Sequence, residues 1–154
     1  QNPEVQLFCG SVEEEIAFGP RQLGLSQAEV KKRTDDVMKM IGLENLASRP
    51  PYHLSGGEQK KTALACVLSM NPEVLILDEP LNGLDRKSRE WMLSFLTQWK
   101  HAGKTLLISS HDETLLRLIP ERIIELSESH TIIYDGPKED WHESERTETA
   151  SGNL

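Results

Sequence analysis

The stretch VLILDE, residues 74–79, constrains the fold more than any other part of the chain. Four consecutive apolar side chains that end in two acids and a proline are typical of a central parallel strand covered on both faces. A second run of this kind, KTLLISS at 104–110, follows after one helical segment at about 86–101. Strands that alternate with helices in this way predict an α/β fold with a largely parallel sheet.

Helical segments precede the first predicted strand. Ser26 and Glu29 have the spacing of a capping box and begin a helix that extends to about Ile41. A shorter amphipathic piece occupies residues 11–19. The region up to about Ser48 is therefore expected to form a small helical lobe of its own.

After the second strand, the sequence predicts a short helix capped by Asp112 and two edge strands at 122–126 and 131–136. Residues 138–154 are acidic and polar and have little to bury, so we expect them to form a flexible tail. The predicted parts are a helical lobe at 1–48, an α/β core at 49–137 and the tail at 138–154.

The composition excludes several classes of protein. The 154 residues carry a formal net charge of -8, and an acidic surface argues against nucleic acid as a partner because phosphate backbones attract clusters of Lys and Arg. The two cysteines, Cys9 and Cys66, are far apart and have no metal-binding spacing, which suits a cytosolic protein with reduced thiols. No apolar run approaches the length of a membrane span, so attachment to a membrane is expected to need another protein.

Two acids end the first predicted strand. In open α/β sheets, ligands bind outside the carboxyl ends of the strands, where Asp78 and Glu79 are expected to lie. One carboxylate can hold Mg²⁺, directly or through water, and an adjacent acid can polarise an attacking water. The alternative is that the acids only terminate a strand. Their occurrence as a pair, followed by a proline and a glycine-containing turn, favours the functional interpretation.

A serine and two glycines precede the third predicted helix. The first amides of a helix lack intrahelical acceptors and lie at the positive end of the helix dipole, so they favour an anion. Ser55, Gly56 and Gly57 are therefore candidates for binding a phosphate. Taken alone, the stretch is better explained as an ordinary capping box of Ser55 with Glu58.

Three further residues are ambiguous by themselves. His111 follows the second strand and can contact a phosphate oxygen or hold a water, or can merely precede a helix. Asp85 is better explained, in isolation, as the N-cap of the next helix. Gln1 indicates nothing by itself.

The order of these motifs resembles the ATPase domain of ATP-binding-cassette (ABC) proteins from the Q-loop onward. In that resemblance, Gln1 is the Q-loop glutamine, LSGGE at 54–58 is the signature motif, VLILDE is Walker B, LNGLD at 81–85 is the D-loop and His111 is the switch histidine. The resemblance implies an α/β fold of the P-loop NTPase type, with the RecA-like core represented by its carboxyl-terminal portion. QNPEVQLF and SVEEEIAFGP are especially similar to ATP-binding subunits of energy-coupling-factor and cobalt- or nickel-type importers.

The resemblance also implies an activity and partners: ATP hydrolysis with Mg²⁺, coupled to import of a small solute such as a metal ion or vitamin. It implies a peripheral protein at the cytoplasmic face of the membrane, bound to a transmembrane subunit. In this family, ATP lies between two ATPase domains that face each other. Ser55, Gly56 and Gly57 would therefore bind the nucleotide of an identical or related second ATPase subunit, and Asp85 would act across the same dimer.

The remaining residues receive roles in catalysis from the same resemblance. Asp78 would act on Mg²⁺, and Glu79 would be the general base for the attacking water. His111 would contact the γ-phosphate. Gln1 would touch Mg²⁺ or water and would connect the site to the helical lobe.

Some positions depart from the common pattern of the family. Glu58 stands where Gln is frequent, Lys61 where Arg is usual, and Leu81 and Asn82 where Thr and a small residue are common. Since Lys lacks the planar fork of Arg, we expect the contacts of the signature helix at Lys61 to differ from the common pattern.

The sequence contains no GxxxxGK[ST] loop, so we expect a fragment that does not hydrolyse ATP on its own. Two other functions stay open on sequence alone. One is a non-transport ABC ATPase, although a chromosome-maintenance ATPase would need a long coiled coil where only about fifty residues lie between the Q-loop and the signature. The other is a non-hydrolysing interaction module that docks on a membrane subunit.

Overall fold

The computed structural model describes residues 7–141. The chain divides into two compact units, of which the first ends at Ser109 and the second begins at Ser110, and each is described by itself. No helix within residues 7–141 is long and apolar enough to cross a membrane.

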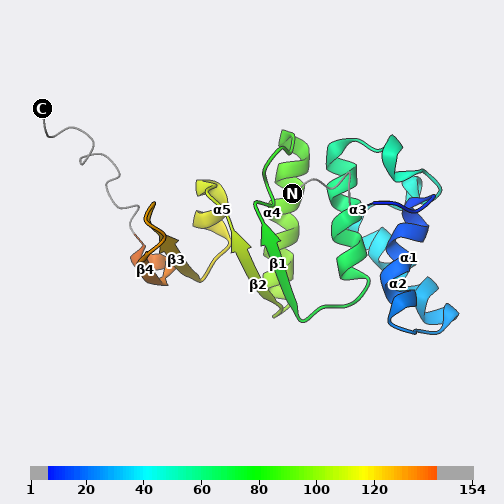
Figure 1. Ribbon diagram of the computed structural model, residues 1–154, viewed down its shortest axis with the longest axis horizontal. Coiled ribbons are helices and arrows are strands. Elements are labelled where there is room, and N and C mark those ends of the chain that lie inside the picture. Colours follow the sequence, from blue (N-terminus) through cyan, green and yellow to red (C-terminus); the bar gives the residue numbers. More distant parts are fainter. Residues whose placement is uncertain (1–6, 142–154) are drawn as a thin grey trace, which may run out of the picture. The chain divides into compact units, whose positions relative to one another are not determined.

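The first unit contains four α-helices and a pair of strands (Figure 1). In chain order they are α1 (Val12–Gln22), α2 (Gln27–Ile41), the 3-10 helices η2 (Glu44–Leu46) and η3 (Pro51–His53), α3 (Gly56–Leu68), β1 (Val74–Asp78), α4 (Arg86–His101) and β2 (Thr105–Ser109). The second unit contains α5 (Glu113–Leu118), β3 (Arg122–Leu126), β4 (Ile132–Pro137) and the 3-10 helix η4 (Lys138–Asp140).

Capping residues explain where the long helices begin. Ser26 and Glu29 form the predicted capping box at the start of α2, and Gly42 ends this helix in the left-handed conformation with φ 78°. Ser55 and Glu58 form a second capping box at the start of α3. Each box satisfies backbone amides that helix geometry leaves without an intrahelical acceptor.

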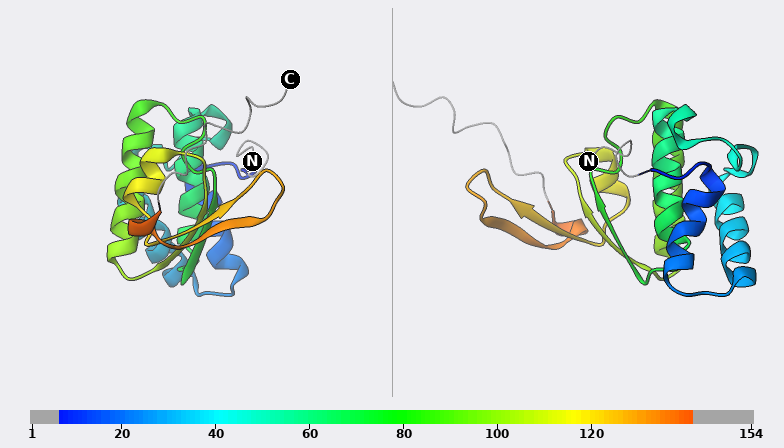
Figure 2. Two further views of the ribbon diagram at one scale, coloured as in Figure 1. Left: turned by 90° about the vertical axis from the view of Figure 1, so that its left-hand side faces the viewer. Right: turned by 45° about the vertical axis from the view of Figure 1, so that its right-hand side comes forward.

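Helices α1, α2 and α3 pack against one another, as the views in Figure 2 show. Their apolar faces meet in a core whose most deeply buried side chains are Val12, Ile16, Ile41, Leu43 and Ala65. The periodicity of the sequence predicts these buried faces, since apolar residues recur at helical spacing. Helix α3, which the sequence analysis placed in the α/β core, packs against the helices of the lobe predicted at 1–48.

Helix α1 is longer than the predicted piece at 11–19 and continues through Pro20 to Gln22. A proline inside a helix has no N–H for the carbonyl four residues earlier, which here is that of Ile16. The hydroxyl of Ser69 donates to this carbonyl oxygen at 2.9 Å. The helix can therefore pass through Pro20 without leaving a buried carbonyl unsatisfied.

A buried carboxylate fixes the segment before α1. Glu15 is only 5% exposed, and its Oε2 accepts hydrogen bonds from the amides of Phe8, at 2.9 Å, and Cys9, at 2.6 Å. Burial, followed by the charge of the Glu15 carboxylate, raises the pKa of Cys66 to about 12. The thiol of Cys66 is therefore protonated at neutral pH, and Cys9 and Cys66 form no disulfide.

Strands β1 and β2 are parallel, which confirms the α/β class with a parallel sheet. Leu75, on one face of the pair, is 2% exposed, and α4 runs along the strands in Figure 1. On the other face, Ile76 and Leu107 are 69% and 58% exposed. The prediction that β1 is covered on both faces is therefore wrong for the described residues, because they provide a cover for one face only.

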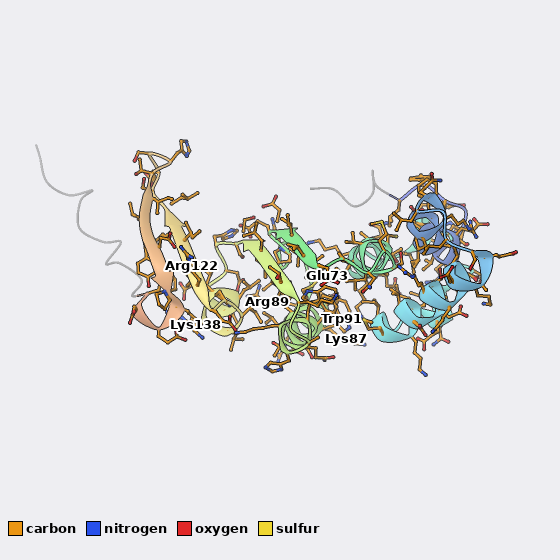
Figure 3. All side chains as sticks on the ribbon, turned by 90° about the horizontal axis from the view of Figure 1, so that it is seen from below. Glu73, Lys87, Arg89, Trp91, Arg122 and Lys138 are labelled. Carbon is orange, nitrogen blue, oxygen red and sulfur yellow. The ribbon has the colours of Figure 1, made fainter. Side chains whose placement is uncertain are left out.

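The second unit is built on the antiparallel pair of β3 and β4, which confirms the two strands predicted near 122–126 and 131–136. Arg122, labelled in Figure 3, forms a two-pronged ion pair with Asp135, with N–O distances of 2.7 and 2.8 Å. Within the stretch where the sequence predicted a loose tail, residues 138–140 form η4. The indole N–H of Trp141 then donates to the Glu125 carboxylate at 2.9 Å. Residues 142–154 lie outside the described residues.

Candidate functional site at the strand ends and the start of α3

The carboxyl ends of β1 and β2 bring a carboxylate and a hydroxyl together. Asp78 and Ser109 are partners in the strand register, and the Ser109 hydroxyl donates a hydrogen bond to Oδ1 of Asp78. Both side chains are exposed. The sequence reasoning missed Ser109, although the signal was available, because parallel strands end at the same edge of a sheet. This edge is where ligands bind in open α/β sheets.

Glu79 follows β1 in an unusual backbone conformation. Its φ of 44° lies in the left-handed region, which is uncommon for residues other than glycine. Its amide donates to the carbonyl oxygen of Ser109 at 2.9 Å, so the pairing with β2 extends one residue beyond the strand. Backbone strain of this kind clusters at functional sites and supports a role for Glu79 beyond ending a strand.

Asp78 offers one exposed carboxylate at the end of β1 as a ligand for Mg²⁺. Within residues 7–141, no group of three or more His, Cys, Asp and Glu side chains is arranged to hold a metal ion. Mg²⁺ keeps several waters and is commonly held by one or two carboxylates together with phosphate oxygens. The exposed carboxylate of Asp78 therefore fits Mg²⁺ bound with a nucleotide.

The start of α3 presents a serine and an open glycine. The Ser55 hydroxyl donates to Oε2 of Glu58 at 2.8 Å, and the Ser55 amide donates to the same oxygen at 2.8 Å. These bonds from Ser55 lower the pKa of the Glu58 carboxyl. No heavy atom lies within 4 Å of the place where a Cβ on Gly56 would stand, so a ligand can approach the backbone here. Glu58 therefore has a defined role in holding Ser55.

Gly57, unlike Gly56, is closely surrounded by other atoms. A Cβ on Gly57 would overlap the hydroxyl of Ser88 and would lie 3.9 Å from Oδ2 of Asp85. Asp85 is the N-cap of α4, as the capping interpretation predicts, and accepts the Ser88 amide at 2.8 Å. This hydrogen bond lowers the pKa of the Asp85 carboxyl. Gly57 thus permits the close approach of α3 to the start of α4, and the structure brings two predicted site residues, Gly57 and Asp85, together.

Two departures from the family pattern have structural explanations. The Lys61 ammonium lies 4.4 Å from the centroid of the Trp91 ring, and Figure 3 labels Trp91 on α4. Lysine makes this cation–π contact with a compact ammonium, whereas arginine would present a planar fork. Burial, and then the charge of Lys87, lower the pKa of Lys61. Leu81 is 3% exposed and belongs to the apolar core.

His111 and Gln1 are not among the described residues of the first unit. His111 belongs to the second unit, where its side chain is exposed and directly precedes Asp112, the N-cap of α5. Gln1 lies outside the described residues. Asp78, Glu79 and the start of α3 all belong to the first unit.

Comparison with known proteins identifies the class that this fold and site define. A family model described as ABC transporter matches residues 2–82, which is about half of the chain. The chain belongs to the ABC transporter family. This confirms the resemblance inferred from the order of the motifs.

The chain is also similar in sequence to individual ATP-binding proteins. The chain is 50% identical over 135 residues to the nickel import ATP-binding protein LarO of Lactiplantibacillus plantarum, a match that covers 88% of this chain and 56% of LarO. It is 40% identical over 154 residues to the energy-coupling factor transporter ATP-binding protein EcfA of Methanococcus maripaludis, which covers 100% of this chain and 55% of EcfA.

A solved structure agrees with these relatives. The structure of cbiO1 from Clostridium perfringens, part of the ABC transporter complex cbiONQ, matches with a TM-score of 0.76 and 34% identity. The match covers 90% of this chain and 55% of cbiO1. The chain therefore spans about half the length of the proteins that it matches.

Proposed function

We propose that the chain is part of the ATP-binding subunit of an importer that couples ATP hydrolysis to transport of a small solute, such as a metal ion or a vitamin. The observation that carries the proposal is the acid pair of Asp78 and Glu79 at the carboxyl end of β1, with Glu79 held in the left-handed conformation. The names of LarO, EcfA and cbiO1 support the importer class.

Asp78 and Glu79 have different proposed roles in ATP hydrolysis. Asp78, beside the Ser109 hydroxyl, holds Mg²⁺ directly or through water. Glu79 is the general base that takes a proton from the attacking water. Catalysis of phosphoryl transfer consists mainly of positioning and charge stabilisation, which suits two acids fixed on a strand end.

The start of α3 serves the nucleotide of a second subunit. The Gly56 amide donates to its phosphate, since Gly56 is open to an approaching ligand, and the Ser55 hydroxyl does so by exchanging its bond to Glu58. Gly57 contributes mainly by letting α3 approach α4. Asp85 acts across the dimer from the beginning of α4, and His111 and Gln1 contact the γ-phosphate and Mg²⁺ or its water.

These roles require partners. A second ATPase subunit, identical or related, supplies the nucleotide on which Ser55 acts. A transmembrane subunit keeps the protein at the cytoplasmic face of the membrane as a peripheral component. The net charge of -8 gives no support to a nucleic-acid partner.

The 154 residues alone are proposed to be inactive, because they contain no GxxxxGK[ST] loop to cradle phosphates. We expect no thermal shift of the isolated chain with Mg-ATP. A clear rise in melting temperature with Mg-ATP would show that the isolated chain binds the nucleotide without such a loop.

The test of the proposed function is ATP hydrolysis by the longer protein that carries this chain together with a GxxxxGK[ST] loop, assembled with its partner and membrane subunits. Glu79→Gln should lower kcat by about a hundredfold or more while ATP still binds, because the base is lost but the binding groups stay. The matched control is Glu90→Gln on the exposed side of α4, which should hydrolyse ATP normally. Normal turnover in Glu79→Gln would refute the assignment of the base. No turnover in the wild-type assembly would favour a non-hydrolysing interaction module.

A further inference from the structure

A chain of hydrogen bonds joins α3 to the turn that follows Glu79. The Lys60 ammonium, on α3, donates to the carbonyl oxygen of Asn82. The amide of Asn82 donates in turn to the carbonyl oxygen of Glu79 at 3.1 Å, which closes a four-residue turn. Lys60 therefore holds the far end of the turn that begins at the proposed general base.

Neighbouring contacts keep the same surfaces together. Gly57 packs against Ser88, and the Lys61 ammonium lies over the Trp91 ring. Positions 60 and 61 lie three and four residues after position 57, so all three are on one side of α3. These contacts all reach residues 82–91, so one face of α3 is joined to that segment at several points.

The surroundings of Lys60 suit a positioning role. Its side chain is partly buried, and this burial lowers the pKa of the ammonium. Its acceptor is a backbone carbonyl, so the bond depends on where the main chain of Asn82 lies and on no side chain there. This hydrogen bond therefore restrains the position of the turn's backbone.

We propose that Lys60 is a positioning residue that couples the signature helix α3 to the backbone of Glu79. The inference rests on the proposed function, in which Ser55 acts on the nucleotide of the partner subunit and Glu79 acts on water in its own site. When Ser55 takes up a phosphate, α3 shifts and carries Asn82, and through it Glu79, into position. One lysine in each subunit thus links the two nucleotide sites of a dimer.

The test is steady-state ATP hydrolysis by the complete ATPase, assembled with its partner and membrane subunits. Lys60→Met keeps an unbranched apolar stem and removes the donor. We expect kcat to fall about ten- to a hundredfold, as when a catalytic group is slightly misplaced, while KM for ATP stays nearly unchanged. Lys60→Arg keeps a charged donor and should recover most of kcat. A purely structural role for Lys60 would not separate kcat from KM in this way.

The matched control is Lys104→Met, since the Lys104 ammonium bonds the Glu73 carboxylate at 2.9 Å in the same unit. It should show wild-type kcat and KM. Each variant is assayed below its melting temperature, with its folded fraction checked by circular dichroism. Wild-type kcat in Lys60→Met, or an equal loss in Lys60→Arg, would overturn the coupling. If the wild-type assembly does not hydrolyse ATP, the proposed function fails. If the wild type is active and Lys60→Met has the same kcat, only the coupling proposed here is overturned.

Discussion

The Ser69 hydroxyl lies 2.9 Å from the carbonyl oxygen of Ile16 and 2.8 Å from that of Cys66, and its one proton is shared between these two acceptors. Ile16 lies four residues before Pro20, so this carbonyl has no amide donor in its own helix. Ser69 is 1% exposed and directly follows α3. The hydroxyl therefore takes the place of the missing amide and ties the end of α3 to the middle of α1.

Ser69→Ala is predicted to lower the free energy of unfolding by about 1–3 kcal/mol, because a buried carbonyl would lose its donor. Denaturant unfolding followed by circular dichroism measures this change. The control Ser94→Ala, on the exposed side of α4, should change the free energy by less than about 0.5 kcal/mol. Pro20→Ala restores an amide for Ile16, so Ser69→Ala should cost less in that background. An equal cost in both backgrounds would contradict this explanation.

Gly56 and Gly57 are predicted to respond oppositely to alanine. Gly57→Ala should lower stability by about 1–3 kcal/mol, since its Cβ would displace the Ser88 hydroxyl. Gly56→Ala should leave stability unchanged, because the space there is open, and should lower only ATP turnover in the complete assembly. Thermal unfolding and ATPase assays on both variants separate these effects. The prediction fails if Gly56→Ala unfolds more easily than Gly57→Ala.

Glu15 is predicted to stabilise the first unit through its acceptor oxygen. Glu15→Ala should cost about 1–3 kcal/mol, because the amides of Phe8 and Cys9 would lose a buried partner. Glu15→Gln keeps an amide oxygen as acceptor and should cost less. Hydrogen exchange at the Phe8 and Cys9 amides gives a local readout, and we expect faster exchange in Glu15→Ala. Unchanged exchange there would show that the carboxylate does not hold this segment.

The capping box of α3 is predicted to lose strength in acid. The hydrogen bonds from Ser55 lower the pKa of Glu58 below its value of 4.5 in the unfolded chain. A carboxyl whose pKa is depressed by folding contributes stability above its unfolded pKa, and this contribution disappears as the pH falls through its folded pKa. The advantage of the wild type over Glu58→Gln should therefore be constant above about pH 5 and shrink below pH 4.5.

Urea unfolding of the two proteins between pH 6 and 3 tests this dependence. The exposed Glu90→Gln variant shows how much an ordinary surface glutamate contributes over the same range. A difference between wild type and Glu58→Gln that grows toward acid would have the wrong sign for the proposed hydrogen bonds.

Local sequence signals predicted much of the fold correctly. Ser26 with Glu29 and Ser55 with Glu58 mark real helix starts, because capping depends on residues only three positions apart. Gly103 has a left-handed conformation, with φ 73°, just after α4, which suits a glycine at the end of a helix. The continuation of α1 through Pro20 was missed because the compensating hydroxyl comes from a residue some fifty positions away.

In the candidate site, too, the sequence predicted residues but not their tertiary contacts. Asp78, Glu79, Ser55 and Asp85 were proposed from their places at a strand end or a helix start and from the order of the motifs. Their contacts were not, because Lys60 reaches Asn82 only when α3 and the turn after β1 are brought together.

The sequence by itself determined the helix starts, the two parallel strands and the family, since these depend on short-range patterns and on the order of motifs. Only the tertiary structure decided what each candidate residue touches. Gly57 proved to be a packing glycine and Gly56 an open one, although the sequence treats them alike. The physical reason is that close approach depends on how two helices pack, and that packing is made by residues distant along the chain.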